Sequence, residues 1–463
     1  MHLTTLLPLA AIALSVTNTT EAQVPNIVIF NTDDQGWSDL GSYGAIGYET
    51  PNIDSLAAHG IKFTSFYAAS SVSSPSRASL LTASYPLRVG LPEVLAPEGP
   101  KWAEGRNNMG LNPNETTIPR LLKPLGYATG CIGKWHLGHH EDFLPLNHGF
   151  DIFFGLPYSN DMRPETASFY PDLPLIYGNE TIELNPDQTD LTIRFTEQAI
   201  NFISQSLENT EPFFLYFAHT MPHTPLYVSE KFEGSTENGM YGDVIAEIDW
   251  SVGEVVKILR DNGQLNNTLI IFTSDNGPWQ VFGNHAGLTG PFRGDKGTTF
   301  EGGHRVPAIM HWPDVIPAGQ VSDEIVTNMD ILPTICSLNG IQLPENKIDG
   351  KCIFEILKGE PGAKSPHDAF YYYNGSNLEA VRSGKWKIHF THNYRSVLKP
   401  GFDGDIGSYH FPKQEEALYN LETNPGENIN LKEEYIEVFE RLKKMGEIFD
   451  ADLKQNARPP GHI

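Results

Sequence analysis

Five short apolar runs, each bounded by turn residues, recur along the chain. They are NIVIFNTDD (26–34), ATGCIGKWH (128–136), FFLYFAHTMPH (213–223), TLIIFTSDNG (268–277) and PAIMHW (307–312). Continuous apolar runs of this length are typical of strands that are buried on both faces. We therefore expect these runs to form the core of one sheet.

Two amphipathic stretches lie between these runs. Residues 190–208 and 242–263 carry apolar side chains at helical spacing, and the second stretch ends at Asn262-Gly263, a typical helix C-terminus. Strands that alternate with helices predict an α/β fold, with a large, mostly parallel sheet flanked by helices.

The pattern changes after about residue 365. Short antiparallel strands and turns are expected there, followed by a helix, because its apolar residues keep i, i+3, i+4 and i+7 spacing: Tyr435, Val438, Phe439, Leu442, Met445 and Phe449. We predict a large domain over residues 23–365 and a smaller C-terminal α+β subdomain, an antiparallel sheet plus helix, over residues 366–463.

Residues 1–22 have the pattern of a secretory signal peptide. An apolar run from Leu3 to Val16 is followed by small and polar residues, although Lys and Arg are absent before it. A buried N-terminal strand is the alternative. No later apolar run approaches the ~18 residues of a membrane span. We expect a secreted or periplasmic protein without a membrane span.

Charge restricts the partners of this chain. Lys and Arg number 32 against 57 Asp and Glu, which gives a net charge of −25. Long-range repulsion disfavours nucleic acid or an anionic membrane surface as partner. An anionic ligand would need a local basic pocket.

Three cysteines are too few for a disulfide framework, and their spacing fits no zinc pattern. Cys131 lies in an apolar run and is expected to be a buried small hydrophobe. Cys336 and Cys352 are the one pair that an oxidising compartment could join, and the sequence leaves that pairing open.

Ionisable residues follow four of the five expected strands. In open α/β sheets, ligands bind beyond the carboxyl ends of the strands. The residues at these ends are Asp33-Asp34, Lys134 with His136, His223, and Asp275-Asn276. We expect them to form one site.

The acidic pairs indicate a hard cation. Adjacent carboxylates repel each other unless a cation lies between them, and oxygen ligands select Ca²⁺ or Mg²⁺. For Asp33 and Asp34 alone, a solvated acidic turn is the alternative. Asp275 and Asn276, from a second strand end, favour the metal site.

The basic residues indicate an anion. Lys134 and His136 are expected to point the same way from an extended segment, and Lys296 lies in a glycine-rich stretch that permits close approach of an anion. Structural roles remain open for the histidines, and a flexible surface loop for Lys296. Together with Arg77 and His223, these groups would suit a tetrahedral oxyanion.

The motifs that carry these residues resemble those of the formylglycine-dependent sulfatases, type I. SSPSRASLLT (73–82) is similar to their signature, in which Cys or Ser before x-Pro-Ser-Arg is oxidised to formylglycine. PNIVIFNTDDQGWSDLGSYG, GKWHLG, HTMPHTP, TSDNG and RGDKGTTFEGGHRVPAI follow in the family's order. DGKCIFEILKG and LYNLETNPGENINL resemble its C-terminal pattern, so the resemblance covers nearly all the chain after residue 24.

The resemblance implies a fold like that of alkaline phosphatase and assigns the site residues. Ser73 would be the formylglycine precursor, a serine-type site that implies a sulfatase-maturating enzyme as partner. Ca²⁺, rather than Mg²⁺, would be held by the modified Ser73 and by Asp33, Asp34, Asp275 and Asn276. The remaining catalytic residues would be Arg77, Lys134, His136, His223 and Lys296.

The substrate is implied only in outline. FGLPYSNDMRP (154–164) looks like a segment of arylsulfatase A-like and galactosamine sulfatase-like members, which implies exo-action on a sulfated glycan, on galactose or N-acetylgalactosamine sulfate. Asp161, Arg163 and His304 are expected to share a sugar subsite. The net charge also favours a small pocket for a chain end over an extended groove for a polyanion.

Two alternatives stay open. One is a phosphatase or phosphodiesterase of the same superfamily that uses unmodified Ser73, and the other is a glycan-binding pseudoenzyme. The chain also departs from the family at Ala83-Ser84, where Gly-Arg is frequent, and we expect this change to affect loop packing or maturation rather than the chemistry.

Overall fold

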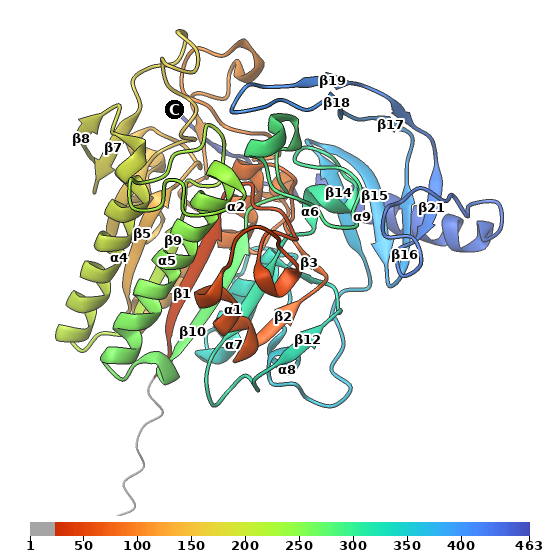
Figure 1. Ribbon diagram of the computed structural model, residues 1–463. Helices are drawn as coiled ribbons and strands as arrows, with labels where there is room; N and C mark the ends of the chain where they lie inside the picture. The colour runs from red at the N-terminus through yellow and green to blue at the C-terminus, as the bar shows by residue number, and fades with distance from the viewer. Residues whose placement is uncertain (1–23) are drawn as a thin grey trace, which may run out of the picture.

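A ten-stranded sheet forms the centre of the structure, a computed structural model that describes residues 24–463 (Figure 1). The expected signal peptide lies outside the described residues. The strand order is β12-β2-β11-β10-β1-β9-β5-β6-β7-β8. In chain order these strands are β1 (Asn26–Thr32), β2 (Ile61–Phe63), β5 (Ala128–Lys134), β6 (Ile152–Leu156), β7 (Pro174–Tyr177), β8 (Glu180–Leu184), β9 (Phe213–Ala218), β10 (Thr268–Ser274), β11 (Ala308–His311) and β12 (Gln320–Ser322).

The sheet is mostly parallel, as the sequence predicts. Strands β10, β1, β9, β5 and β6 form a parallel centre. Only β11 and β7 run against it, because each pairs antiparallel with both of its neighbours, which leaves eight of the ten strands in one direction. The run at 307–312 is therefore a core strand, but one that ends at the opposite edge of the sheet from the other four predicted runs.

The two faces of the sheet bury different sets of helices. Along β1, Ile27 and Ile29 belong to one core and Val28 and Phe30 to the other, as the alternation of a strand requires. One core takes side chains from α1 (Pro51–Ala58), α4 (Leu191–Glu208) and α5 (Gly239–Asp261). The other takes them from α2 (Ser73–Thr82), α3 (Ile118–Leu122), α7 (Ile331–Leu338) and α8 (Phe354–Leu357).

A second, antiparallel sheet lies beside the first. Its strand order is β14-β15-β16-β21, and helix α9 (Ile436–Gln455) packs on it through Phe439 and Leu442. Its strands are β14 (Phe370–Asn374), β15 (Asn377–Ser383), β16 (Trp386–His389) and β21 (Ala417–Asn420). The expected α+β elements after residue 365 are therefore present.

Short elements complete the chain. Four two-stranded pairs are formed by β3 (Phe66–Tyr67), β4 (Met109–Gly110), β13 (Val326–Thr327), β17 (His392–Asn393), β18 (Ser396–Lys399), β19 (Ser408–His410), β20 (Lys413–Gln414) and β22 (Gly461–His462). The short helix α6 spans Glu301–His304. Within residues 24–463, no helix has both the length and the apolar character needed to cross a membrane.

The predicted helices begin and end close to the expected residues. Helix α5 ends at Asp261, with Asn262 as C-cap and Gly263 in a left-handed conformation (φ +67°). All three cysteines are free thiols in the structure, Cys131 and Cys336 buried and Cys352 exposed. Cys131 is thus the buried small residue that the sequence predicts.

Helix α2 ends on a residue other than glycine in a left-handed conformation. Ala83 is its C-cap, with φ +55° and ψ +27°. The Ala83 carbonyl oxygen accepts hydrogen bonds from the backbone N–H groups of Asp349 and Gly350, at 2.8 and 2.9 Å. A left-handed backbone is strained for a residue with a Cβ atom, so the Gly that is frequent in the family at this position has a conformational reason.

We predict that Ala83→Gly raises the free energy of unfolding by about 0.5 to 1 kcal/mol, because glycine adopts φ +55° without the steric cost of Cβ. Chemical denaturation monitored by circular dichroism measures the change. Ala78→Gly, in the interior of the same helix, is the control and should lower stability by about 1 kcal/mol. Equal losses for both variants would contradict the strain at Ala83.

Candidate active site

Four oxygen-bearing side chains meet beyond the carboxyl ends of β1 and β10. The two strands pair in parallel with Thr32 opposite Ser274, so the residues that follow each strand emerge side by side. The backbone N–H of Asp34 donates to Asp275 Oδ1 at 3.1 Å, and Asn276 Nδ2 donates to Asp34 Oδ1 at 2.7 Å. With Asp33, these residues form a buried cluster from two strand ends.

Ser73 joins this cluster from the first turn of α2. The N-cap of α2 is Val72, and no side chain caps the first turn of the helix. Instead, Ser73 Oγ donates to Asp33 Oδ1 at 3.1 Å and lies 3.4 Å from Asn276 Oδ1. The hydroxyl therefore faces the acidic cluster.

Arg77 lies one turn further along α2 and is completely buried. Its Nε donates to Asp275 Oδ2 at 2.9 Å, and its Nη1 donates to the Lys134 carbonyl oxygen at 2.9 Å. Burial by itself lowers the pKa of Arg77, but the nearby Asp275 and Asp33 carboxylates raise it above the usual value. Arg77 is therefore a permanent cation, and it contacts residues at the ends of three strands, β1, β5 and β10.

Lys134 is the second buried cation. Its Nζ donates to Asp33 Oδ2 and, at 3.1 Å, to Ser159 Oγ. Burial lowers the pKa of Lys134 and would raise that of Asp33, yet Lys134, His223 and Arg77 bring the pKa of Asp33 below its ordinary value. The carboxylate of Asp33 is therefore ionised because cations surround it.

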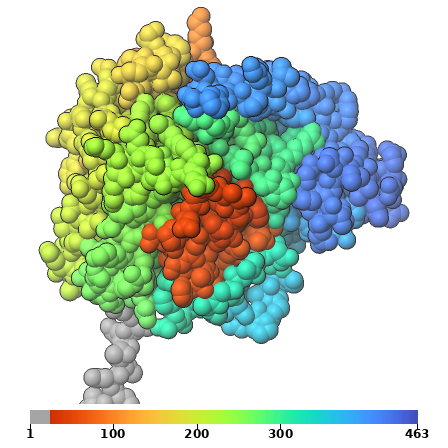
Figure 2. Space-filling model, viewed as in Figure 1, coloured from red at the N-terminus to blue at the C-terminus, as the bar shows by residue number. Residues whose placement is uncertain are grey.

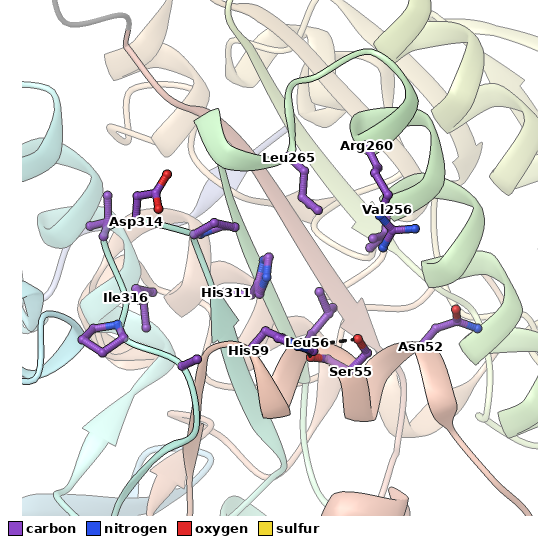
Figure 3. Close-up of a pocket in the computed structure, with 14 residues that line it drawn as sticks. Asn52, Ser55, Leu56, His59, Val256, Arg260, Leu265, His311, Asp314 and Ile316 are labelled. Atoms are coloured by element: carbon purple, nitrogen blue, oxygen red, sulfur yellow. Dashed lines mark hydrogen bonds between the residues drawn. The ribbon is translucent and has the colours of Figure 1, made fainter.

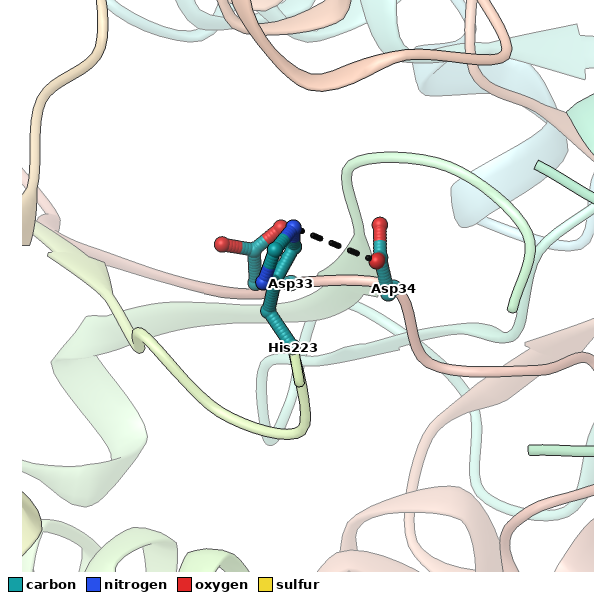
Figure 4. A group of neighbouring side chains, drawn as sticks. All are labelled: Asp33, Asp34 and His223. Carbon is teal, nitrogen blue, oxygen red and sulfur yellow. Dashed lines mark ion pairs between the residues drawn. The ribbon is translucent and has the colours of Figure 1, made fainter. Parts of the chain in front are cut away.

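Lys296 and His223 both approach Asp34. Lys296 Nζ donates to Asp34 Oδ2 at 2.7 Å, and His223 Nε2 lies 3.6 Å from the same oxygen. Figure 4 shows His223 reaching over Asp33 and Asp34 from a separate loop. The other ring nitrogen, Nδ1, lies 2.6 Å from the Thr224 carbonyl oxygen and must carry the proton there, because a carbonyl oxygen only accepts.

His136 reaches the site by a route that differs from the prediction. Strand β5 ends at Lys134, and His136 has a left-handed backbone (φ +60°), so the two side chains do not alternate along an extended segment. Its Nε2 lies 2.9 Å from the Leu95 carbonyl oxygen, while Nδ1 is buried and has no hydrogen-bond partner among residues 24–463. Burial and Lys134 hold the pKa of His136 well below its ordinary value, so the ring is neutral with a free lone pair on Nδ1.

The donor set fits a divalent cation. Ligand atoms of Asp33, Asp34 and His223 lie within 4.8 Å of one another. Asp275 adds a carboxylate oxygen beside Asp34, and Asn276 adds an amide oxygen 3.4 Å from Ser73 Oγ. Three carboxylates and an amide oxygen are the ligands of a hard cation. Bound there, a divalent ion would compete with Lys134 and Lys296 for Asp33 and Asp34.

Two predicted substrate residues lie on the loop after β6. Arg163 Nε lies 3.0 Å from Glu165 Oε2, and its guanidinium lies 5.7 Å from the centre of the Tyr227 ring. Asp161 is partly exposed, and its buried Oδ1 has no hydrogen-bond partner in the part of the chain that the structure describes. Within residues 24–463, none of these contacts joins Asp161 or Arg163 to the acidic cluster, so their place in a sugar subsite stays a prediction.

His304 was expected to share that subsite, and the structure places it elsewhere. It ends α6, its Nδ1 lies 2.9 Å from the Ala68 carbonyl oxygen, and its ring packs 5.1 Å from the ring of Tyr372 in the second sheet. Within residues 24–463, no hydrogen bond, ion pair or ring contact joins His304 to Asp161 or Arg163. The prediction for His304 is therefore wrong, because α6 turns the side chain into the junction between the two sheets.

Two residues at the site were missed from the sequence. Ser159 bonds Lys134, and Trp279 packs beside both His223 (ring centroids 5.5 Å apart) and Lys296 (Nζ 4.6 Å from the ring centre). Ser159 lies within the FGLPYSNDMRP segment and Trp279 directly follows TSDNGP, so proximity to a motif was the available signal.

A separate cavity of about 560 Å³ lies at the opposite edge of the sheet (Figure 3). His59, Arg260 and His311 line it, and His311 pairs with Ile270 near the start of β10, whereas the acidic cluster follows its end. None of the predicted site residues lines this cavity, so the carboxyl ends of the strands remain the candidate active site.

Known proteins share both the sequence and the fold. Residues 25–341 match the sulfatase family model, and residues 365–459 match the C-terminal region of aryl-sulfatase. N-acetylgalactosamine-6-sulfatase of Sus scrofa is 38% identical over 95% of this chain and 87% of its own. Arylsulfatase A of Bos taurus is 38% identical over 90% of this chain and 85% of its own.

Among solved structures, the PsFucS1 sulfatase from Pseudoalteromonas sp. superposes with a TM-score of 0.83 at 30% identity, over 95% of this chain and 92% of that one. These similarities in sequence and fold agree with the cluster of Ser73, Asp33 and Lys134 at the strand ends. This chain belongs to the sulfatase family of sulfuric ester hydrolases.

Proposed function

We propose that this chain is a secreted or periplasmic exo-sulfatase that uses a formylglycine derived from Ser73 to remove sulfate from a galactose or N-acetylgalactosamine unit of a glycan. The observation that carries the proposal is the position of Ser73 Oγ, 3.1 Å from Asp33 and 3.4 Å from Asn276, at the carboxylate cluster that buried cations contact. The same proposal includes the signal peptide, the boundary between the two domains at residues 365 and 366, and the maturating enzyme.

An unmodified serine would be a poor turnover nucleophile. Its attack on sulfur would leave a stable sulfate ester with no easy exit. The formylglycine hydrate supplies two hydroxyls, one to take the sulfuryl group and one whose deprotonation releases sulfate. A divalent cation, Ca²⁺ in preference to Mg²⁺, held by Asp33, Asp34, Asp275, Asn276 and the modified residue, would activate the attacking hydroxyl as a Lewis acid.

The cations of the chain hold and neutralise charge. Arg77 and Lys134 lie on the side of Ser73 and Asp33, where they stabilise the modified residue and its developing charge. We assign Lys296, whose Nζ contacts Asp34, to the sulfate oxygens. Preorganised cations in a buried site stabilise such charge without reorganisation when the reaction occurs.

We assign the two proton-transfer roles, base and acid, from the tautomers of the two histidines. His136 is neutral and keeps an unpartnered lone pair on Nδ1, which suits the base that triggers sulfate release. The Nδ1–H of His223 donates to the Thr224 carbonyl oxygen, and Nε2 faces the site. When Nε2 is protonated, it can give that proton to the leaving sugar oxygen.

Support for the sugar comes from the relatives, several of which are N-acetylgalactosamine-6-sulfatases. We assign Asp161 and Arg163 to hydrogen bonds with sugar hydroxyls or a carboxylate, and we no longer include His304. Unmodified Ser73 acting on phosphate esters, or glycan binding without hydrolysis, are the competing functions. Matched aryl phosphates and aryl sulfates separate them, since we expect sulfate release to dominate.

We predict that Ser73 is oxidised when the protein is made with an anaerobic sulfatase-maturating enzyme. Mass spectrometry of the proteolytic peptide should show a loss of two hydrogens from Ser73, or the corresponding hydrate. Protein made without the maturating enzyme is the control and should carry serine and lack sulfatase activity. Unmodified serine in an enzyme that hydrolyses sulfate esters would refute the formylglycine mechanism.

We predict that His223→Ala slows hydrolysis of a sugar sulfate about 10²- to 10⁴-fold, the usual contribution of a general acid. Activated aryl sulfates should be affected much less, because their leaving groups depart without protonation. Steady-state rates on both substrates test this. His59→Ala, at the cavity on the far edge of the sheet, should change neither rate; equal losses on both substrates for His223→Ala would exclude the acid role.

We predict that Ca²⁺ stabilises the protein more than Mg²⁺ does. At a free concentration about 100-fold above its dissociation constant, a ligand of the native state adds about 2.7 kcal/mol. Denaturant titration after EDTA treatment, with and without each ion, measures the effect. Asn276→Ala should weaken the Ca²⁺ response, while Asp314→Asn, an exposed acid at the far cavity, should retain it. An unchanged response in Asn276→Ala would remove Asn276 from the ligand set.

A further inference from the structure

The β18–β19 hairpin of the C-terminal region contacts the loop that follows β10. The backbone N–H groups of Gly401 and Gly407, in the hairpin, both donate to the Val281 carbonyl oxygen, at 2.8 and 3.0 Å. Figure 2 shows this segment in blue as a ridge along the top of the molecule, against the green segment that contains residue 281. Residues more than 100 positions apart thus border the same site.

Trp279 connects the hairpin to the catalytic groups. Its indole Nε1 donates to the Tyr409 hydroxyl at 2.7 Å, which fixes the plane of the ring. Lys296 Nζ lies 4.6 Å from the ring centre, within the range of a cation–π contact, and the His223 ring lies 5.5 Å away. Tyr409 therefore orients a ring that touches both the expected sulfate ligand and the expected acid.

Arg395 holds the backbone of Lys296 from the same hairpin region. Its guanidinium donates to the Lys296 carbonyl oxygen through Nη2 and, at 3.0 Å, through Nε. The same guanidinium lies 5.3 Å from the centre of the Tyr409 ring. Arg395 and Tyr409 thus act on Lys296 together, one on its main chain and one through Trp279.

Lys296 depends on such support. A lysine ammonium is a point charge on a flexible four-carbon stem, and it lacks the geometric preference of a guanidinium. Its direct carboxylate partner is Asp34, an oxygen donor that a divalent cation would also use. When the cation takes that oxygen, the Trp279 ring still contacts Nζ. The Lys296 main chain stays fixed by Arg395 at its carbonyl oxygen and by the Pro278 carbonyl oxygen, which accepts from its N–H at 2.9 Å.

We infer that Tyr409 and Arg395 are positioning residues that hold Lys296 for the sulfate group, Tyr409 through Trp279 and Arg395 through the Lys296 main chain. The inference rests on the proposed function, because it takes Lys296 as the sulfate ligand. It assigns the C-terminal hairpin a part in binding substrate, although neither Tyr409 nor Arg395 needs to touch the reacting atoms.

Tyr409→Phe tests the inference, because it removes one hydroxyl and keeps the ring beneath Arg395. The dissociation constant for inorganic sulfate, measured by calorimetry on the matured, Ca²⁺-loaded enzyme, and the KM for a small aryl sulfate should both rise about three- to tenfold, the effect of one hydrogen bond. The kcat value should stay within about twofold, since ground-state and transition-state binding are lost together.

Tyr373→Phe is the matched control. It also removes a tyrosine hydroxyl from the C-terminal region, one that donates to Asp450 at 3.2 Å away from the β10 loop. It should leave sulfate affinity and KM unchanged. Thermal midpoints and Ca²⁺ affinity of both variants should match the parent enzyme, which separates positioning from a general loss of structure.

A double-mutant cycle with Trp279→Phe tests whether Tyr409 acts on Lys296 through Trp279. Phenylalanine has no N–H, so adding Tyr409→Phe to Trp279→Phe should weaken sulfate binding by less than about twofold. Additive losses, or a Tyr409→Phe enzyme that binds sulfate as the parent does, would overturn the inference. A matured parent enzyme that neither binds nor releases sulfate would instead refute the proposed function, so the two failures are distinguishable.

Discussion

The active-site arrangement depends on a balance of three negative and three positive charges that are buried together. The carboxylates are Asp33, Asp34 and Asp275, and the cations are Arg77, Lys134 and Lys296. Burial of an unpaired carboxylate is costly, and it raises the pKa of the group. Asp33 shows the opposite net shift because Lys134, His223 and Arg77 surround it. Loss of one of these cations would leave the buried carboxylates with too little compensating charge, which is more disruptive than loss of a surface ion pair.

The parallel sheet delivers these charges to one place. The strands β1 and β10 end in register, and β9 and β5 lie next to them, so four strand ends contribute to the same edge. The chain then leaves the regular sheet geometry where the chemistry requires it. Asp34 and His136 both have left-handed backbones, with φ of +65° and +60°. Aspartate and histidine tolerate this conformation better than branched residues do, and strain of this kind concentrates at functional sites.

The sequence predicts the parts of the site that follow directly from strand ends. The runs that contain Asp33, Lys134 and Asp275 are buried strands, and the parallel centre of the sheet brings their ends together. It does not predict that the run at 307–312 is antiparallel, since buried strands of either direction have the same apolar pattern. His304 is misplaced because a four-residue helix turns it towards Tyr372, and no periodicity marks so short an element. The bond between Trp279 and Tyr409 joins residues 130 positions apart and leaves no local signal.

The segment from Lys296 to Glu301 connects the expected active site to the second sheet. Glu301 is fully buried and accepts hydrogen bonds at Oε1 from the Tyr372 hydroxyl (2.6 Å) and Lys387 Nζ (3.0 Å), both in the second sheet. Burial would raise the pKa of the neighbouring Glu427, but Lys387 and His389 lower it to about 2, so this junction is ionic as well. One end of the segment therefore carries the expected sulfate ligand and the other is held by charges of the C-terminal sheet. Without that sheet, Glu301 would keep the Tyr67 hydroxyl (2.6 Å) and Arg305 (3.3 Å) as partners at Oε2. It would lose both partners at Oε1, five residues from Lys296, so the second sheet supplies part of the charge balance of this segment.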